Sequence, residues 1–294
     1  MASGGMALWT ALLFTPVLIR WLRHRRIGQH IREDGPASHV VKAGTPTMGG
    51  VAILGAAVAG YFMGHVGTEV RFSRAGLLVV ATVVVFGGIG FLDDWIKVRH
   101  RRSLGLQTRG KLTAQIVAGV VFAELAVHWA HTATTLSFVR MSAPGLQLGE
   151  AGWVVLATVV LVATSNAVNL TDGLDGLAAG SATFCFAVLA IIGYWVFRHF
   201  AIYHLLTASA IDLALCSVAL AGACLGFLWW NAAPARIMMG DTGSLAIGSG
   251  LAAICLLLNI DLLLPIVGGL FVIETLSVIA QVVSYRVFGR RILR

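Results

Sequence analysis

Long apolar stretches recur from one end of this 294-residue chain to the other. Each has about 16 to 23 residues, roughly the length that a helix needs to cross the hydrocarbon core of a bilayer. The composition agrees, because 58% of the residues are hydrophobic, only 12% are charged, and the mean hydropathy is +0.87. This balance argues against a water-soluble fold, and the sequence lacks the alternating strands of an outer-membrane barrel. We therefore expect an all-α, polytopic helical membrane protein.

Nine of these stretches are candidate membrane spans. They cover residues 6–22, 48–64, 76–92, 112–128, 152–168, 177–197, 207–229, 244–260 and 264–285. Alternating the loops between them places all 21 Lys and Arg on one side except Arg71, Arg74, Arg140 and Arg198. Because basic loops are retained in the cytoplasm, this bias predicts an N-terminus outside and a C-terminus inside. No repeat or linker divides the chain, so residues 1–294 are expected to form a single helical transmembrane domain.

Other features have simpler explanations than a further function. The first stretch lacks the basic leader and cleavage site of a signal peptide, so we interpret it as a span. The cysteines lie in apolar stretches without metal-ligand spacing, which favours a packing role for Cys185, Cys216, Cys224 and Cys255. The net charge of +8 comes from basic residues beside the spans, which indicates topology and no nucleic acid partner.

Five Asp residues stand in three of the predicted cytoplasmic segments. They are Asp93 and Asp94 after the third span, Asp172 and Asp175 after the fifth, and Asp241 between the seventh and eighth. Adjacent carboxylates at a membrane edge repel one another, so they need a cation or a basic partner to stay ionised. One such Asp alone would more simply cap a helix or pair with Arg. The whole set favours a Mg²⁺ site that shares its ion with a diphosphate.

The segment around Asp172 and Asp175 reads NLTDGLDG. If it is helical, the spacing of three residues places both carboxylates on one face, and Thr171 or Asp172 could cap the helix. The two glycines would let phosphate or uracil oxygens approach exposed backbone N–H groups.

Basic and hydroxyl side chains accompany these acids. The segment KAGTPTMGG, residues 42–50, offers Lys42, Thr45 and Thr47 to an anionic group, although a Gly-Pro turn is also a common start for a membrane helix. Lys97 and Lys111 add positive charge beside the paired Asp, whereas the neighbouring Arg residues are expected to meet lipid headgroups.

Taken together, these motifs make the sequence resemble the phospho-N-acetylmuramoyl-pentapeptide transferases. That family belongs to glycosyltransferase family 4, the polyprenyl-phosphate N-acetylhexosamine-1-phosphate transferases. The resemblance spans nearly the whole chain and is carried by KAGTPTMGG (42–50), FLDDWIK (91–97), NAVNLTDGLDGLA (166–178), NAAPARIMMGDTGS (231–244) and ETLSVIAQ (274–281).

The resemblance implies an enzyme of peptidoglycan synthesis in the bacterial cytoplasmic (inner) membrane, with its active site on the cytoplasmic face. It would transfer phospho-N-acetylmuramoyl-pentapeptide from UDP-MurNAc-pentapeptide to undecaprenyl phosphate, giving lipid I and UMP. The family requires Mg²⁺, lies among membrane lipids and suggests a homodimer. Phosphoryl transfer rests mainly on positioning and charge neutralisation, which acids, a metal and lysines supply.

The matching motifs also assign expected roles to single residues. Asp241 would bind Mg²⁺, and Asp93 and Asp94 would handle the lipid phosphate. Lys97 and Lys111 would lie near the phosphates. The nucleotide-sugar pocket would be lined by Lys42, Thr47, Asn169, Asp172, Asp175, Asn231 and Gln281. Residue types leave open a covalent aspartyl-phosphate intermediate, but we favour direct attack with Asp93 as the base.

Two departures from the family pattern are visible. Met238 stands where the family usually has an aromatic residue against uracil, so we expect weaker or altered nucleotide contacts. The sequence given ends at Arg294, where the family continues into a His-rich loop and a tenth span. The alternatives are therefore a sister transferase that uses UDP-N-acetylglucosamine and an inactive homologue that binds the carrier lipid or nucleotide. A transporter is a third alternative, because the intramembrane acids Glu124 and Glu274 could mark an ion path.

Overall fold

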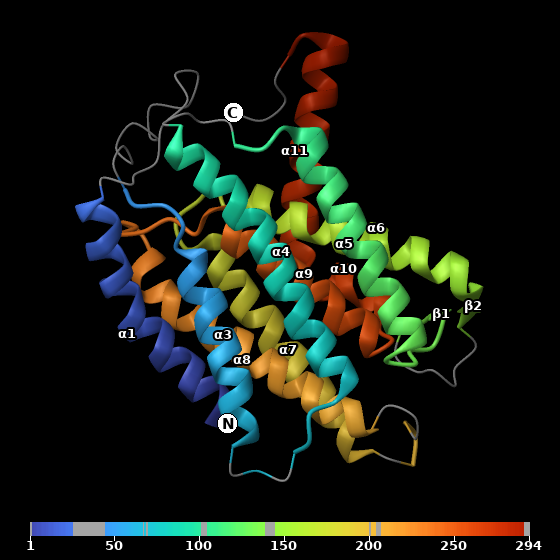
Figure 1. Cartoon of the computed structure of the whole chain (residues 1–294). Helices are drawn as coiled ribbons and strands as arrows, with labels where there is room; N and C mark the ends of the chain where they lie inside the picture. Colours follow the sequence, from blue (N-terminus) through green and yellow to red (C-terminus); the bar gives the residue numbers. More distant parts are fainter. Residues whose placement is uncertain are drawn as a thin grey trace.

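The computed structural model describes residues 2–25, 45–66, 68, 70–100, 105–138, 145–199, 201–203 and 207–290. Helices dominate this part of the chain (Figure 1). Their bounds are α1 Ala2–His24, α3 Gly50–His65, α4 Arg74–Arg99, α5 Thr108–His128, α6 Gly149–Thr171, α7 Leu177–Arg198, α8 Thr207–Asn231, α9 Gly240–Leu257, the 3₁₀ helix η1 Asp261–Leu263, α10 Leu264–Val267 and α11 Gly269–Phe288. Two short strands, β1 Thr135–Leu136 and β2 Leu146–Gln147, pair antiparallel between α5 and α6.

The arrangement confirms a polytopic all-α membrane protein. Within the described ranges, eight helices are long and apolar enough to cross a membrane, and each overlaps a predicted span. The predicted span 48–64 corresponds to α3, which has only 16 residues. The amides of Gly49 and Gly50, which have no acceptor within the helix, donate to the carbonyls of Met238 and Met239.

The core of the bundle is α9, which is buried over nearly its whole length. Half of its residues are Gly, Ala or Ser, and such small side chains let neighbouring helices approach closely in a membrane protein. Helices α4 and α6 pack along it, and α6 crosses the bundle obliquely (Figure 1). A helix that is apolar on all sides belongs in the interior of a bundle, and other parts of the protein accordingly surround α9.

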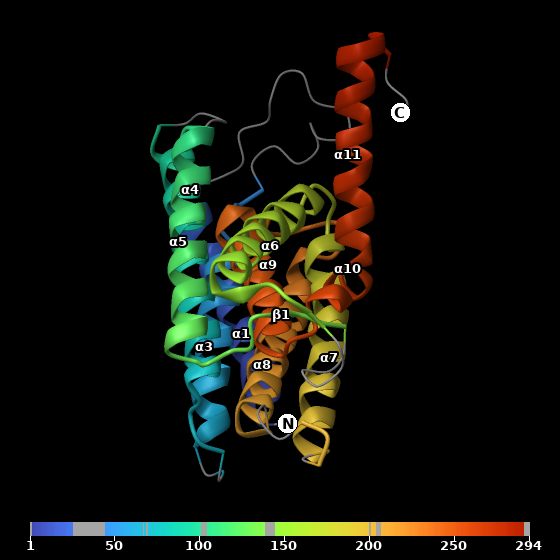
Figure 2. The ribbon, with the colours of Figure 1, turned by 90° about the vertical axis from the view of Figure 1, so that its right-hand side faces the viewer.

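The last predicted span, 264–285, is interrupted. Its first residues form α10, which ends at Gly268, and a separate helix α11 then begins at Gly269. Two consecutive glycines weaken helix continuity at this point. Helix α11 extends beyond the rest of the bundle and leaves most of its apolar surface uncovered by protein (Figure 2), as expected for a helix that faces lipid.

Candidate active site

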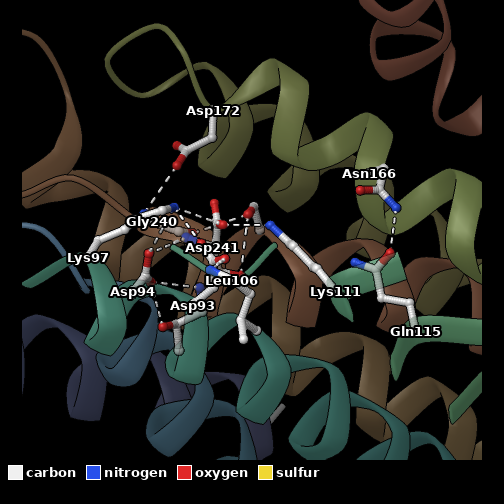
Figure 3. A network of polar contacts seen from close by, with 12 residues as sticks. Asp93, Asp94, Lys97, Leu106, Lys111, Gln115, Asn166, Asp172, Gly240 and Asp241 are labelled. Carbon is white, nitrogen blue, oxygen red and sulfur yellow. Dashed lines mark hydrogen bonds and ion pairs between the residues drawn. The ribbon is translucent and has the colours of Figure 1, made fainter. Parts of the chain in front are cut away.

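Three carboxylates that are distant in sequence meet where α4 ends and α9 begins (Figure 3). Each of Asp93, Asp94 and Asp241 offers an oxygen, and these three oxygens lie within 4.8 Å of one another. Asp93 and Asp94 are buried, whereas the side chain of Asp241 keeps 13% of its surface exposed. We call these three residues the aspartate triad. The structure thus brings together three of the five acids that the sequence singled out.

Asp94 is held by the first turn of α9. Its two carboxylate oxygens accept the amides of Asp241 and Thr242 at 3.2 and 2.9 Å, and the Thr242 hydroxyl donates at 2.7 Å. A carboxylate at this place also faces the positive end of the α9 dipole. Gly240 precedes this turn with φ of 75°, and a Cβ there would lie 2.7 Å from the Asp94 carboxylate. Both requirements favour glycine at this position.

Asp93 is tied to the connection between α4 and α5. Its Oδ1 accepts the Leu106 amide at 2.8 Å. A Cβ at Gly105 would lie within 2.7 Å of three atoms of the Asp93 carboxylate. Gly105 and Leu106 therefore lie against Asp93, and its other oxygen, Oδ2, contacts Lys97.

Two lysines neutralise most of the charge of the triad. Lys97 Nζ lies 2.6 Å from Asp93 Oδ2, 2.9 Å from Asp241 Oδ2 and 3.8 Å from Asp94 Oδ1. Lys111 Nζ lies 2.6 Å from the same Asp241 Oδ2. When all three carboxyls are ionised, the two ammonium groups leave one negative charge, which a further cation can balance. Clustered carboxylate oxygens beside a cation suit the hard ion Mg²⁺, so the residues present fit the predicted metal.

The second pair of acids, Asp172 and Asp175, accepts hydrogen bonds from backbone amides of the segment before and at the start of α9. Asp172 Oδ2 accepts the Gly240 amide at 3.2 Å, and Asp175 Oδ2 accepts the Ala235 amide at 3.1 Å. The expectation of a shared helical face is wrong, because α6 ends at Thr171 and α7 begins only at Leu177. The glycines between them, with Gly176 at φ of 75°, break the helix.

Asn231 joins the loop before α7 to the end of α8. Its Oδ1 accepts the Gly176 amide at 3.1 Å, and its Nδ2 donates to the Ile237 carbonyl at 2.9 Å. The side chain is buried. Asn231 therefore sets the relative position of the two loops that carry Asp175 and Met238.

The segment with Thr47 packs against the loop before α9. The Met238 amide donates to the Pro46 carbonyl at 2.8 Å, and the Met238 carbonyl accepts the Gly49 amide at 2.9 Å. Thr47 is half-buried between these bonds, and Met238 is 5% exposed. Lys42 lies outside the described residues.

The remaining predicted residues are Asn169 on α6 and Gln281 on α11, both half-buried. Their contact with a nucleotide sugar stays a prediction. The sequence analysis missed a polar pair between α5 and α6, in which Asn166 Nδ2 donates to Gln115 Oε1 at 2.8 Å. The spacing of four residues between Lys111 and Gln115 is the signal that could have found it, because it places both on one face of α5.

The sequence of this chain is similar to those of known proteins. The family model described as Glycosyl transferase family 4 matches residues 76–259, and the Phospho-N-acetylmuramoyl-pentapeptide-transferase signature 1 matches residues 42–54. A phospho-N-acetylmuramoyl-pentapeptide-transferase of Frankia casuarinae is 48% identical, over 98% of this chain and 84% of that protein. One of Streptomyces avermitilis is 45% identical, over 99% of this chain and 85% of that protein. The chain belongs to this family of transferases.

The two family matches include most residues of the candidate site. The signature includes the segment that packs on Met238, and the longer match runs from α4 through the triad to Asn259 at the end of α9. The parts of the chain that match the family therefore include the place where the carboxylates of the aspartate triad converge.

Proposed function

We propose that this transferase moves phospho-N-acetylmuramoyl-pentapeptide from UDP-MurNAc-pentapeptide to undecaprenyl phosphate at the aspartate triad, giving lipid I and UMP. The observation that carries the proposal is the convergence of Asp93, Asp94 and Asp241 with two lysines. The names of the relatives and the motifs shared with them support the proposal.

Asp241 would hold Mg²⁺, with Asp93 and Asp94 beside it. When bound, the ion neutralises the charge of the diphosphate and polarises the phosphorus that is attacked. Asp94 contributes mainly by fixing the first turn of α9, and with it the position of Asp241, through three hydrogen bonds.

The protein side chains would position the two substrates for a direct displacement. An oxygen of the lipid phosphate bonds to the sugar-bearing phosphorus while the bond from that phosphorus to the UMP oxygen breaks. Asp93 would take the proton of a monoprotonated lipid phosphate through Oδ2, the oxygen that contacts Lys97. Lys97 and Lys111 would balance the charge of the phosphates.

The nucleotide sugar would lie beside the loops that Asp172, Asp175 and Asn231 hold together, near Thr47, Asn169 and Gln281. Lys42 belongs to this proposed pocket by its motif. We place the site at the cytoplasmic face of the bacterial inner membrane, with the N-terminus outside. A homodimer surrounded by membrane lipids is part of the same proposal.

The test is an assay of purified protein with both substrates. We expect UMP release that requires Mg²⁺, stops with a chelator and needs undecaprenyl phosphate. UDP-N-acetylglucosamine is offered as the competing donor. If it is consumed in preference, the sister transferase is correct, and if nucleotide binds without any UMP release from folded protein, the inactive homologue is correct.

A further inference from the structure

Lys97 lies in the middle of the aspartate triad. Its Nζ is within 4.0 Å of an oxygen of Asp93, Asp94 and Asp241, at 2.6, 3.8 and 2.9 Å. Lys111, by contrast, has one such contact among the described residues, with Asp241. The position of Lys97 follows from α4 itself, because Asp93 and Asp94 precede it by four and three residues and share its face.

A metal ion that bridges Asp93 and Asp241 through their Oδ2 atoms would compete with this ammonium group. Mg²⁺ binds carboxylate oxygens at about 2.0 to 2.1 Å. Lys97 Nζ already contacts Asp93 Oδ2 and Asp241 Oδ2, and Asp93 Oδ1 is engaged by the Leu106 amide. Both oxygens of Asp94 are engaged by the first turn of α9. A divalent ion and an ammonium group on the same few oxygens would repel each other strongly.

We infer that Lys97 occupies the cation position of the triad in the substrate-free protein and leaves it when the metal binds. This inference rests on the proposed function, since it takes the triad as the metal site. The side chain has room to move, because 31% of it is exposed and its four-carbon stem is flexible. The displaced ammonium group then becomes available to a substrate phosphate beside the metal.

One consequence is a thermodynamic link between the metal and the substrate. Metal binding releases the ammonium group of Lys97, which can then pair with the phosphate. A phosphate that pairs with Lys97 in turn removes the group that competes with the metal for the carboxylates. Each ligand therefore strengthens the binding of the other, even before any direct contact between them. Lys97 thus acts as an exchangeable counter-ion, while Lys111 keeps its single contact with Asp241.

The experiment measures Mn²⁺ binding to the purified full chain by electron paramagnetic resonance, without substrates. We expect Lys97→Gln to tighten Mn²⁺ binding by about tenfold or more, because the competitor is gone. Lys111→Gln removes the same charge from the same carboxylate and is expected to have a clearly smaller effect. Arg99→Gln removes a charge from an exposed position of the same helix end and should leave the affinity unchanged.

A second readout uses the unaltered protein and so does not depend on how the variants fold. Amine acetylation is followed by mass spectrometry with and without Mn²⁺. We expect Mn²⁺ to increase the acetylation of Lys97 several-fold relative to Lys111. Unchanged or reduced acetylation of Lys97, or equal tightening in the two lysine variants, would overturn the inference.

The same measurements separate this inference from the proposed function. Asp241→Asn must abolish the Mn²⁺ site if the triad binds the metal. Mn²⁺ binding that is absent, or that persists in Asp241→Asn, would overturn both the proposed metal site and the role of Lys97. Mn²⁺ binding that depends on Asp241 but leaves Lys97 in place would contradict the exchange alone.

Discussion

At the scale of residues, the buried Asp93 and Asp94 are fixed by hydrogen-bond donors from other segments of the chain. The five acids and two lysines were recognisable because charged side chains stand out at the ends of apolar stretches. Their hydrogen-bond donors were not recognisable: Asp94 accepts from Thr242, and Asp93 accepts from the Leu106 amide. Such contacts depend on which helix ends meet in space, and spacing along one helix does not contain that information.

A substitution at Gly90 tests how closely the backbones of α4 and α9 must approach each other. A Cβ at Gly90 would collide with the Asp241 carbonyl, whereas a Cβ at Gly88 on the same helix would meet nothing within 4 Å. We expect Gly90→Ala to lower the stability by about 1 to 3 kcal/mol through overpacking and to displace Asp241. Thermal unfolding in detergent and UMP release measure the two effects. Gly88→Ala is the matched control, and equal behaviour of the two variants would refute this contact.

Thr242 tests whether Asp94 supports the first turn of α9. Thr242→Val removes the hydroxyl that donates to the buried Asp94 carboxylate at 2.7 Å, while the amide bond remains. Loss of a hydrogen bond to a charged group costs about 1.5 to 3 kcal/mol. The melting temperature should fall accordingly, and Thr242→Ser should largely restore it. A Val variant as stable as the wild type would show that the hydroxyl contributes nothing.

At the scale of elements, every predicted span overlaps a helix, because apolar length is a strong signal. The structure departs from the predicted helices where the local backbone conformation is not helical. These places are the turn before α3, the loop 172–176 and the break at Gly268. The sequence also did not show how acids within the predicted spans are paired. Asp212 lies within the predicted span 207–229, yet its carboxylate accepts from Tyr61 and Ser73 and lies 3.0 Å from His65 Nε2. These groups come from α3, from α8 and from the start of α4, so the sequence of one span could not show them.

The buried Asp261, beyond the end of α9 that is opposite to the triad, leads us to expect that the stability of the protein depends on pH. It precedes α10, is 6% exposed, and accepts the Ser137 amide at 3.4 Å. Burial raises the pKa of Asp261 from 3.8 to about 7. Between these pH values the folded protein keeps a proton that the unfolded chain has lost. Stability should therefore fall as the pH rises from about 4 to about 7, by on the order of 3 kcal/mol.

Denaturant unfolding of detergent-solubilised protein across this pH range measures the slope. Asp261→Asn cannot titrate, so the difference in stability between wild type and variant isolates the contribution of this residue and should fall as the pH rises. A difference that does not change with pH, or that changes in the opposite direction, would show that Asp261 is ionised in the folded protein.

At the scale of the whole molecule, the orientation follows from the bias of Lys and Arg between the loops and remains a prediction. All four native cysteines are buried, so single introduced cysteines can report topology. Thr68, between α3 and α4, and Thr108, at the start of α5, are both exposed and are predicted on opposite sides. In intact cells, an impermeant maleimide should label Thr68→Cys and spare Thr108→Cys until the membrane is opened. The reverse pattern would invert the topology.

The central claim is that the aspartate triad is the site of phospho-sugar transfer. Its most direct test compares UMP release by Asp241→Asn and Asp261→Asn, which make the same change at opposite ends of α9. We expect Asp241→Asn to lower turnover on the order of 10² to 10³-fold, since it loses charge that organises the transition state. Asp261→Asn should keep turnover near that of the wild type. Undiminished turnover in folded Asp241→Asn would contradict the account.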